Sequence, residues 1–127
     1  MILGIKALHE LVEKDRLVED LCDREKNNHE GAGFDLRFGE IYEIEGDGFL
    51  GVEERDTPEI KLLGSFDANK KENHFVFEPG KYYLIKTIEK VNLPTHLSGI
   101  IFPRTTLFRS GLGLFNGVVQ PGYSGEL

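Results

Sequence analysis

The sequence has little cysteine, no excess of basic residues and no long apolar run. Its single cysteine, Cys22, excludes an intramolecular disulfide and a cysteine-rich zinc site. No apolar run approaches the roughly 20 residues that a membrane-spanning helix needs. The first four residues, Met-Ile-Leu-Gly, lack the basic start of a signal peptide. We therefore expect a soluble, cytoplasmic protein.

The charge balance is acidic. The net charge of −7, from 22 acidic and 15 basic residues, argues against a broad surface for duplex nucleic acid. An anionic ligand would have to be met by a local cluster of basic groups. The length of 127 residues fits one domain, and the chain contains no internal repeat, low-complexity tract or linker.

The N-terminal segment has the apolar period of a helix. A helix is predicted there that ends near Asp15-Arg16. Residues 17–21 are ambiguous, and residues 23–30 have the polar composition of a loop. The apolar positions that recur at helical spacing are Ile2, Ile5, Leu8, Leu11 and Val12.

After residue 31 the apolar period changes to two. Phe34, Leu36 and Phe38 alternate with charged residues, as expected for a half-buried strand. Many short strands, 15 glycines and a lone N-terminal helix predict an all-β sandwich or barrel. A charged turn is expected at 67–73, and further strands are expected at 41–44, 49–52, 60–66, 74–78, 81–91 and 97–102.

The C-terminal part of the sequence is apolar and rich in glycine. Asn116-Gly117 lies at the centre of residues 111–119 and predicts a tight hairpin. Residues 120–127 then look like the start of a strand. Since a β-domain rarely stops there without a later strand to pair with, we expect a chain that is truncated or incomplete at its C-terminus.

The strongest chemical signal lies between residues 102 and 112. Arg104 and Arg109 flank two consecutive hydroxyl side chains, Thr105 and Thr106. Arginine offers a planar fork of donors that suits phosphate oxygens, and threonine adds a short neutral donor. Closely spaced in one turn, these groups can all meet one polyphosphate. The motif alone fits equally well a turn with solvated arginines and threonines that cap a short helix.

Four segments resemble, in order, the motifs of the superfamily shared by dUTP diphosphatases and zinc-independent dCTP deaminases. Gly-Ala-Gly-Phe-Asp-Leu-Arg at 31–37 resembles the first motif, and Arg-Thr-Thr-Leu-Phe-Arg-Ser-Gly at 104–111 resembles the phosphate-binding motif. The archaeal deaminase-like dUTP diphosphatases are the most similar branch. The other matching segments are 78–80 with 87–94, and 121–125.

The resemblance implies a fold, an assembly and a reaction. The fold is a distorted, jelly-roll-like β-barrel (β-clip) with a short N-terminal helix. The assembly is usually a homotrimer with nucleotide sites at the subunit interfaces. The reaction is hydrolysis of dUTP to dUMP and pyrophosphate, with Mg²⁺ carried by the triphosphate. No direct protein ligand of the metal is needed, because Mg²⁺ keeps several waters and binds chiefly through substrate phosphates.

The resemblance also implies roles for individual residues. Arg104, Thr105 and Thr106 would hold the triphosphate, and Arg109 would contact phosphate and help to order the reacting water. Arg109 and Thr105 are thus the catalytic candidates. Asp35 would act near the metal through water, although a strand-edge carboxylate that bonds local amides explains this residue equally well.

Base and sugar would be met by the later motifs. In the family a tight hairpin presents backbone groups to the pyrimidine, and Asn116 can add a side-chain amide to them. Tyr123 resembles the tyrosine that packs on deoxyribose and disfavours a 2′-hydroxyl. A type I′ turn at Asn116 and a core position for Tyr123 are equally compatible with the sequence.

The sequence departs from the family at Gln120, where both branches usually carry an aspartate. Glutamine can hydrogen-bond the sugar but has no pKa suited to general-base work. Either another carboxylate acts, or the activity is altered or lost. A zinc-independent dCTP deaminase, forming dUTP, and a catalytically silent nucleotide-binding paralogue are therefore the alternatives. The deaminase glutamate would lie a few residues beyond Gly125. A zinc cytidine deaminase is excluded, because no His-x-Glu with Pro-Cys-x-x-Cys is present.

Overall fold

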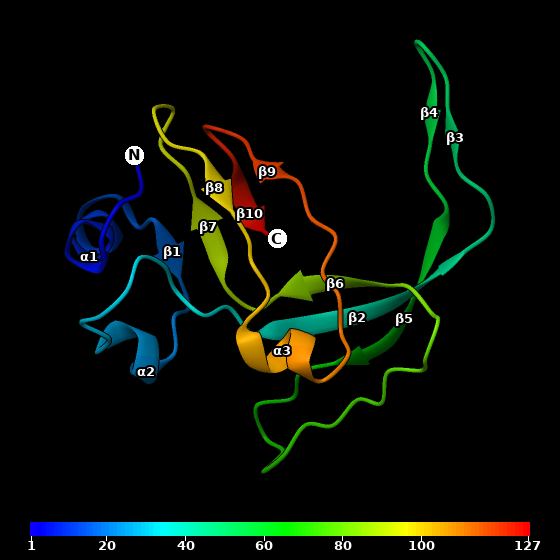
Figure 1. The fold of residues 1–127 in the computed structure, drawn as a ribbon, viewed down its shortest axis with the longest axis horizontal. Coiled ribbons are helices and arrows are strands. Elements are labelled where there is room, and N and C mark those ends of the chain that lie inside the picture. Colours follow the sequence, from blue (N-terminus) through cyan, green and yellow to red (C-terminus); the bar gives the residue numbers. More distant parts are fainter. The chain divides into compact units, whose positions relative to one another are not determined.

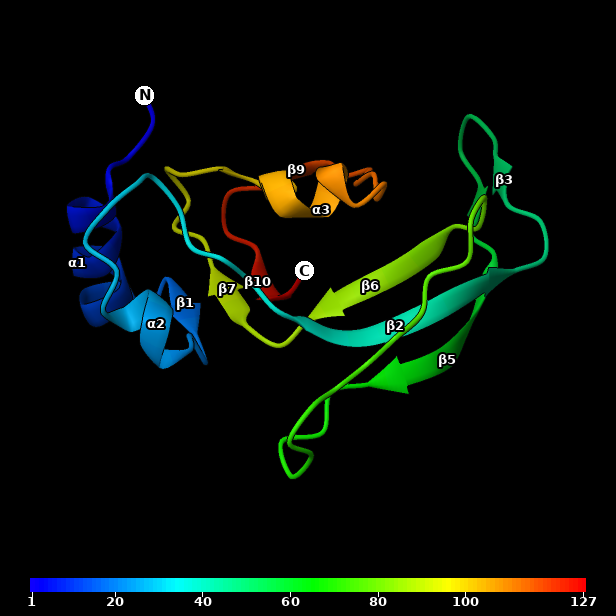
Figure 2. The same ribbon diagram turned by 60° about the horizontal axis from the view of Figure 1, so that its bottom comes forward.

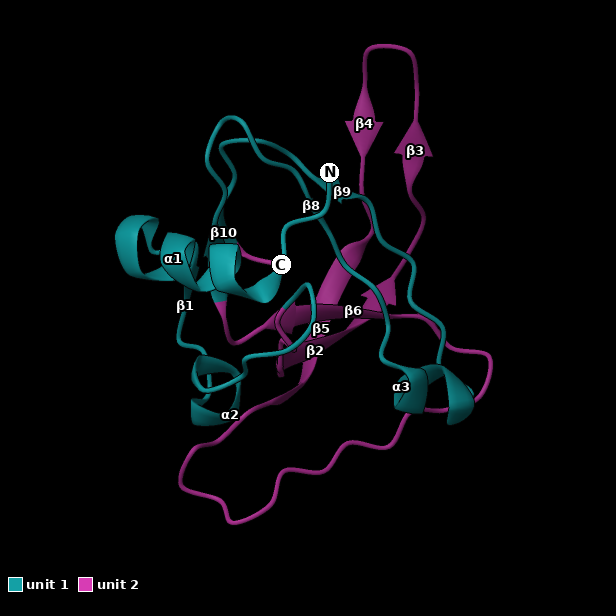
Figure 3. Ribbon diagram, turned by 60° about the vertical axis from the view of Figure 1, so that its left-hand side comes forward, with its two compact units in different colours: residues 1–33, 90–125 teal, residues 34–89, 126–127 magenta.

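The computed structural model describes residues 1–127 and consists of short strands with three short helices. By their contacts these elements form two compact units, and the chain passes from one to the other more than once (Figure 3). Unit 1 contains residues 1–33 and 90–125, and unit 2 contains residues 34–89 and 126–127. None of the helices is long and apolar enough to cross a membrane. The elements are α1 (Ile5–Asp15), β1 (Val18–Glu19), α2 (Asp23–Lys26), β2 (Phe38–Glu45), β3 (Phe49–Leu50), β4 (Arg55–Asp56), β5 (Glu59–Ser65), β6 (Tyr83–Thr87), β7 (Lys90–Asn92), β8 (Gly99–Ile100), α3 (Thr105–Arg109), β9 (Val118–Val119) and β10 (Ser124–Glu126).

Unit 1 is built on a three-stranded sheet in the order β1-β7-β10, with α1 beside β1 (Figure 1). The predicted N-terminal helix is confirmed as α1. It ends at Asp15, because the next residue, Arg16, adopts a left-handed conformation with φ 53°. Val18 pairs with Val91 across β1 and β7. The buried apolar side chains of this unit are Ile5, Leu17, Val18, Leu21 and Val91.

Unit 2 is built on an antiparallel sheet in the order β5-β2-β6 (Figure 2). The central strand β2 places Ile41 opposite Ile85 of β6, and Ile41 is buried. Phe75, Phe77 and Tyr83 form an edge-to-face aromatic cluster, with ring centroids 4.9–5.6 Å apart. The short β3 and β4 strands pair in a hairpin of the same unit.

A buried carboxylate in unit 2 holds Arg37, the last residue of the segment 31–37. Glu89 is fully buried, and its two oxygens accept hydrogen bonds from the Arg37 backbone N–H at 2.8 Å and from Arg37 Nε at 2.6 Å. The Ile88 N–H also donates to the Arg37 carbonyl at 3.0 Å. A carboxylate taken out of water needs such partners. Arg37 is therefore held by a side chain as well as by the backbone.

Several sequence-based strand predictions were wrong. Most of the segments concerned lie next to the Glu89 carboxylate or in the aromatic cluster. The alternating segment 34–37 precedes β2 rather than forming a strand, since it bonds to Glu89. The strand expected at 81–91 is broken at Ile88-Glu89 into β6 and β7. Residues 74–78 are not a strand, and their Phe75 and Phe77 rings pack in the aromatic cluster. The expected loop at 23–30 begins with α2, and the strand expected at 97–102 is limited to β8.

The hairpin predicted at Asn116-Gly117 is also absent. Strand β9 pairs with β8 and not with a segment just before Asn116, and Gly117 is outside the positive-φ region that a type I′ turn requires. Asn116 instead donates its side-chain amide to the Ile101 carbonyl at 2.8 Å. The predicted mostly β fold class with a short N-terminal helix is confirmed, although the four small sheets do not close into a barrel.

Candidate functional site

The arginine-threonine motif forms a short helix, α3, with a well-defined end. Arg104 is its N-cap residue in an extended conformation. At the other end the Gly111 N–H donates to the Phe108 carbonyl at 3.0 Å and the Leu112 N–H to the Leu107 carbonyl at 3.3 Å. Gly111 has φ +85°. This is a Schellman C-cap, in which glycine supplies the left-handed residue.

Helical spacing groups the candidate phosphate contacts. Thr105 and Thr106 lie four and three residues before Arg109, so they neighbour it on the helix surface. All four motif side chains are exposed, with Arg104 preceding the first turn. The segment 104–111 contains two arginines and no acidic residue, in a chain of net charge −7. It is thus a local cationic surface suited to an anion.

A tight turn presents Tyr123. The Tyr123 N–H donates to the Gln120 carbonyl at 3.2 Å, and Gly122 has φ +78°. Proline at the second position and a positive-φ glycine at the third are the requirements of a type II turn. The ring of Tyr123 is 40% exposed. A Cβ atom on Gly125 would lie 3.2 Å from the Tyr123 hydroxyl, so the ring lies against this glycine.

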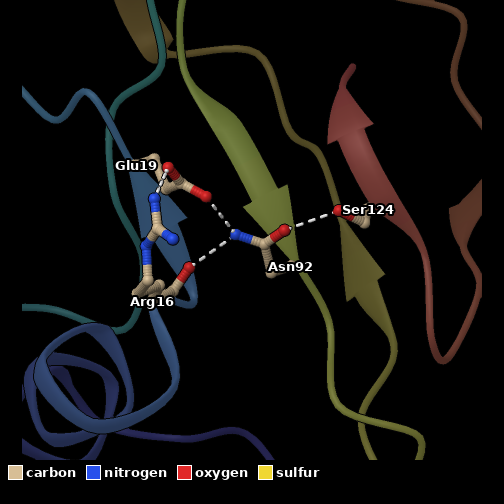
Figure 4. A network of polar contacts seen from close by, with 4 residues as sticks. All are labelled: Arg16, Glu19, Asn92 and Ser124. Atoms are coloured by element: carbon tan, nitrogen blue, oxygen red, sulfur yellow. Dashed lines mark hydrogen bonds and ion pairs between the residues drawn. The ribbon is translucent and has the colours of Figure 1, made fainter.

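A polar network joins this turn to the sheet of unit 1 (Figure 4). The Asn92 amide nitrogen donates to the Arg16 carbonyl and to Glu19 Oε1, each at 2.8 Å, while Asn92 Oδ1 accepts from Ser124 Oγ at 2.6 Å. The hydrogen bond from Asn92, aided by the charge of Arg16, holds the pKa of Glu19 below its ordinary 4.5. All three hydrogen bonds of the Asn92 side chain are thus internal to the unit.

The network borders a hollow of about 420 Å³ in unit 1. Its polar lining includes Lys14, Asp15, Asn92, His96 and Tyr123. A second hollow, of about 320 Å³, lies along the β3-β4 hairpin of unit 2. Neither hollow is lined by residues of α3. The side chains of the phosphate candidates are exposed in the single chain.

The structure brings only part of the predicted site together. Three phosphate candidates lie on α3, and the fourth, Arg104, is its N-cap residue. Asn116, Gln120 and Tyr123 lie on later segments of unit 1, all exposed. Asp35 is half-buried and belongs to unit 2. No group of three or more His, Cys, Asp and Glu side chains is arranged to hold a metal ion. The carboxylate of Asp35 and phosphate oxygens of a ligand are the kinds of donor that Mg²⁺ accepts.

Comparison with known proteins decides the family. The family model described as dCTP deaminase-like matches residues 2–127. The chain belongs to the dCTP deaminase-like family. It is 32% identical over 105 residues to the deoxyuridine 5′-triphosphate nucleotidohydrolase of Methanocaldococcus jannaschii, covering 80% of this chain and 64% of that protein. No solved structure matches it.

Two further relatives carry names that state two different activities. A probable deoxyuridine 5′-triphosphate nucleotidohydrolase of Aeropyrum pernix is 38% identical over 96 residues, which are 75% of this chain and 56% of that protein. A dCTP deaminase, dUMP-forming, of Aquifex aeolicus is 30% identical over 129 residues, covering 100% of this chain and 67% of that protein. The chain thus spans between about half and two thirds of the length of these three relatives.

Sequence reasoning missed two residues that organise this family member's motifs, Glu89 and Asn92. A signal existed for Glu89, because strand alternation puts it on the same face as Ile85 and Val91, where an apolar residue is expected. Asn92 carries a weaker signal, as a polar residue at the end of a strand. Its partners are 32 to 76 positions away in the sequence. Only the fold reveals them.

Proposed function

We propose that this protein hydrolyses dUTP to dUMP and pyrophosphate. The observation that carries the proposal is α3 with its N-cap residue, which together present two arginines and two threonines, all exposed. This motif stands in a chain of the dCTP deaminase-like family, and several of its relatives are named deoxyuridine 5′-triphosphate nucleotidohydrolases.

The reaction needs charge neutralisation more than covalent chemistry. Water attacks the α-phosphorus. The bond between the α-phosphorus and the oxygen that bridges to the β-phosphorus breaks, and pyrophosphate leaves with the electrons of that bond. Arg104, Thr105 and Thr106 bind the triphosphate oxygens. Arg109, one turn further along α3, contacts phosphate and orients the water, with Thr105 as second catalytic candidate. Mg²⁺ carried by the triphosphate would supply further charge neutralisation, and Asp35 is the residue that would act near it through water.

The remaining site candidates recognise the nucleoside. Tyr123 packs on deoxyribose, Gln120 hydrogen-bonds the sugar, and Asn116 contacts the pyrimidine edge. The exposed Tyr123 ring, held by a tight turn, supports the first of these roles. Engagement of the Asn116 amide by the Ile101 carbonyl leaves its carbonyl oxygen to accept a hydrogen bond from uracil N3–H.

We further propose that the active assembly is a homotrimer with sites at the subunit interfaces. Two features support it. The phosphate candidates of one chain are exposed, and the sheet of unit 2 leaves several large apolar side chains exposed. These side chains are Phe38, Ile44, Ile60, Leu62, Leu63 and Leu84.

Complementation tests the shared site. Arg109→Ala and Asp35→Ala variants are each expected to be inactive, and mass measurement in solution should give three chains for both. If Arg109 and Asp35 meet at an interface, trimers reassembled from a mixture regain part of the activity. A mixture that stays inactive would contradict an interfacial site built from these two residues.

Product analysis tests the reaction. With dUTP, release of pyrophosphate and dUMP is expected, and no ammonia should be released from dCTP. The second candidate is dCTP deamination, favoured by the Aquifex aeolicus relative that is similar over the whole chain. Ammonia from dCTP without pyrophosphate from dUTP would replace the first proposal by the second. Tight nucleotide binding with neither product would make the protein a silent paralogue, as Gln120 would allow.

A further inference from the structure

The hydrogen bonds around Tyr123 distinguish this residue from the other exposed aromatic side chains of unit 1. On its N-terminal side, the Gly122 N–H donates to the Leu93 carbonyl at 3.0 Å. The Tyr123 carbonyl itself accepts from the Leu93 N–H at 2.8 Å. On its C-terminal side, the Ser124 hydroxyl donates to Asn92 Oδ1 at 2.6 Å. Residues 92 and 93 thus hold the backbone on both sides of the ring.

Asn92 is itself fixed from the other direction. Its amide nitrogen donates to the Arg16 carbonyl and to Glu19 Oε1, which lie at the end of α1 and on β1 (Figure 4). The amide nitrogen donates to two acceptors and the amide oxygen accepts from one hydroxyl, so only one orientation of the amide satisfies all three hydrogen bonds. The backbone N–H of Asn92 also donates to the Leu17 carbonyl at 2.8 Å. The side chain that receives Ser124 therefore cannot rotate without breaking three hydrogen bonds.

We infer that Asn92 and Ser124 are positioning residues that set the Tyr123 ring and thereby determine discrimination between 2′-deoxyribose and ribose. This inference rests on the proposed function, in which Tyr123 packs on the sugar. Neither residue needs to touch the nucleotide. They act through the position of the ring. Ribose differs from deoxyribose by one hydroxyl, and only a ring held at a fixed position against the sugar excludes that hydroxyl; a ring free to move away would accept ribose as well.

The expected signature is a change in specificity rather than a uniform loss. Ser124→Ala should narrow the preference for dUTP over UTP, measured as the ratio of kcat/KM values, by about threefold, in line with the loss of one neutral hydrogen bond. Asn92→Ala removes all three side-chain bonds and should narrow it by about tenfold or more. The change should be mainly in KM, since the phosphate contacts on α3 are unaltered. Ser124→Thr keeps the hydroxyl and should restore the wild-type ratio.

The matched control is Asn73→Ala in unit 2. Asn73 also uses both ends of its amide, bonding the backbone of Asp67 at 2.9 and 3.1 Å within an exposed turn. Its loss should leave the dUTP to UTP ratio unchanged. Ser124→Ala is the decisive variant if Asn92→Ala folds poorly, because it removes a single exposed hydroxyl.

The outcomes separate this inference from the proposed function. Failure of the unmodified protein to hydrolyse dUTP would overturn the proposed function and this inference with it. Hydrolysis of dUTP by a protein that binds dUMP no more tightly than UMP, measured by calorimetry, would overturn this inference alone. Hydrolysis of dUTP with strong rejection of UTP, unchanged in both Asn92→Ala and Ser124→Ala, would overturn this inference alone. A narrowed ratio in Ser124→Ala that Ser124→Thr restores would support it.

Discussion

Two segments of unit 1 carry candidate substrate groups, and they are held in different ways. Helix α3 is closed by bonds among residues 104–112, and its arginines and threonines are exposed. The turn that carries Tyr123 is bonded to residues 92 and 93, about thirty positions earlier in the chain. The candidate phosphate-binding residues therefore lie on a locally built element, whereas the candidate sugar-binding residue Tyr123 is held by the sheet.

This difference matches two tasks. Phosphate binding depends on positive charge and on hydrogen-bond donors that can adjust to the bound ligand, so exposed arginines on a short helix suffice. Sugar discrimination depends on fixed shape, and fixed shape needs long-range bonds. Variants in α3 should therefore change turnover with little change in stability. Variants around Tyr123 should change stability and specificity together.

The largest expected effect is on turnover in α3. Arg109→Ala should lower kcat for dUTP by about 100- to 1000-fold, the usual cost of removing one donor from a charge-stabilising site. The midpoint of thermal unfolding should stay within error of wild type, because the side chain is exposed. Arg55→Ala, which removes another exposed arginine from β4, is the control and should retain activity. Full activity of Arg109→Ala would show that α3 is not the phosphate motif.

A second prediction concerns the glycine under the Tyr123 ring. Gly125→Ala should lower the free energy of unfolding by about 1–3 kcal/mol, because the glycine has a φ that other residues rarely adopt. The added Cβ would lie 3.2 Å from the Tyr123 hydroxyl and should displace the ring, weakening the preference for dUTP over UTP. Gly113→Ala, with nothing within 4 Å of the added carbon, is the matched control for chemical denaturation. Wild-type stability and specificity in Gly125→Ala would contradict this packing.

A third prediction tests the C-cap of α3. Gly111→Ala introduces no contact within 4 Å but must adopt φ +85°. The expected cost is about 1 kcal/mol of stability, from backbone strain alone. Because Arg109 is the last helical residue, kcat should fall severalfold without a change in sugar preference. Gly111→Asn should lose less, since asparagine tolerates the left-handed region. Equal losses in both variants would argue against strain as the cause.

The features that could be predicted from the sequence are those set by local rules. Helix α1 follows from apolar spacing. The phosphate candidates lie close together because they are contiguous, on α3 and at its N-cap. Their assignment to a nucleotide site came from the resemblance of residues 104–111 to the family's phosphate-binding motif, which is also a contiguous segment.

The features that could not be predicted depend on single long-range bonds. Alternation of Phe34 and Leu36 predicted a strand, but the Glu89 carboxylate bonds this segment instead. Asn116-Gly117 predicted a tight turn, but the Asn116 amide reaches the Ile101 carbonyl. In each case a polar side chain competes with backbone pairing, and its partner is distant in sequence. Asn92 went unnoticed for the same reason.

The smallest expected effect is a pH dependence of the network behind Tyr123. The hydrogen bond from Asn92 lowers the pKa of Glu19 below 4.5, so it contributes stability above that pH. The contribution is lost as the pH falls through the lowered pKa and Glu19 is protonated. The difference in unfolding midpoint between wild type and Asn92→Ala should therefore be largest near neutral pH and should narrow in acid. Ser124→Ala removes a bond between neutral groups, so its difference from wild type should not vary with pH. If the difference in unfolding midpoint from wild type varied with pH in the same way for both variants, the hydrogen bond between Asn92 and Glu19 would contribute no stability. The position of Tyr123 would then depend on the uncharged hydrogen bonds alone.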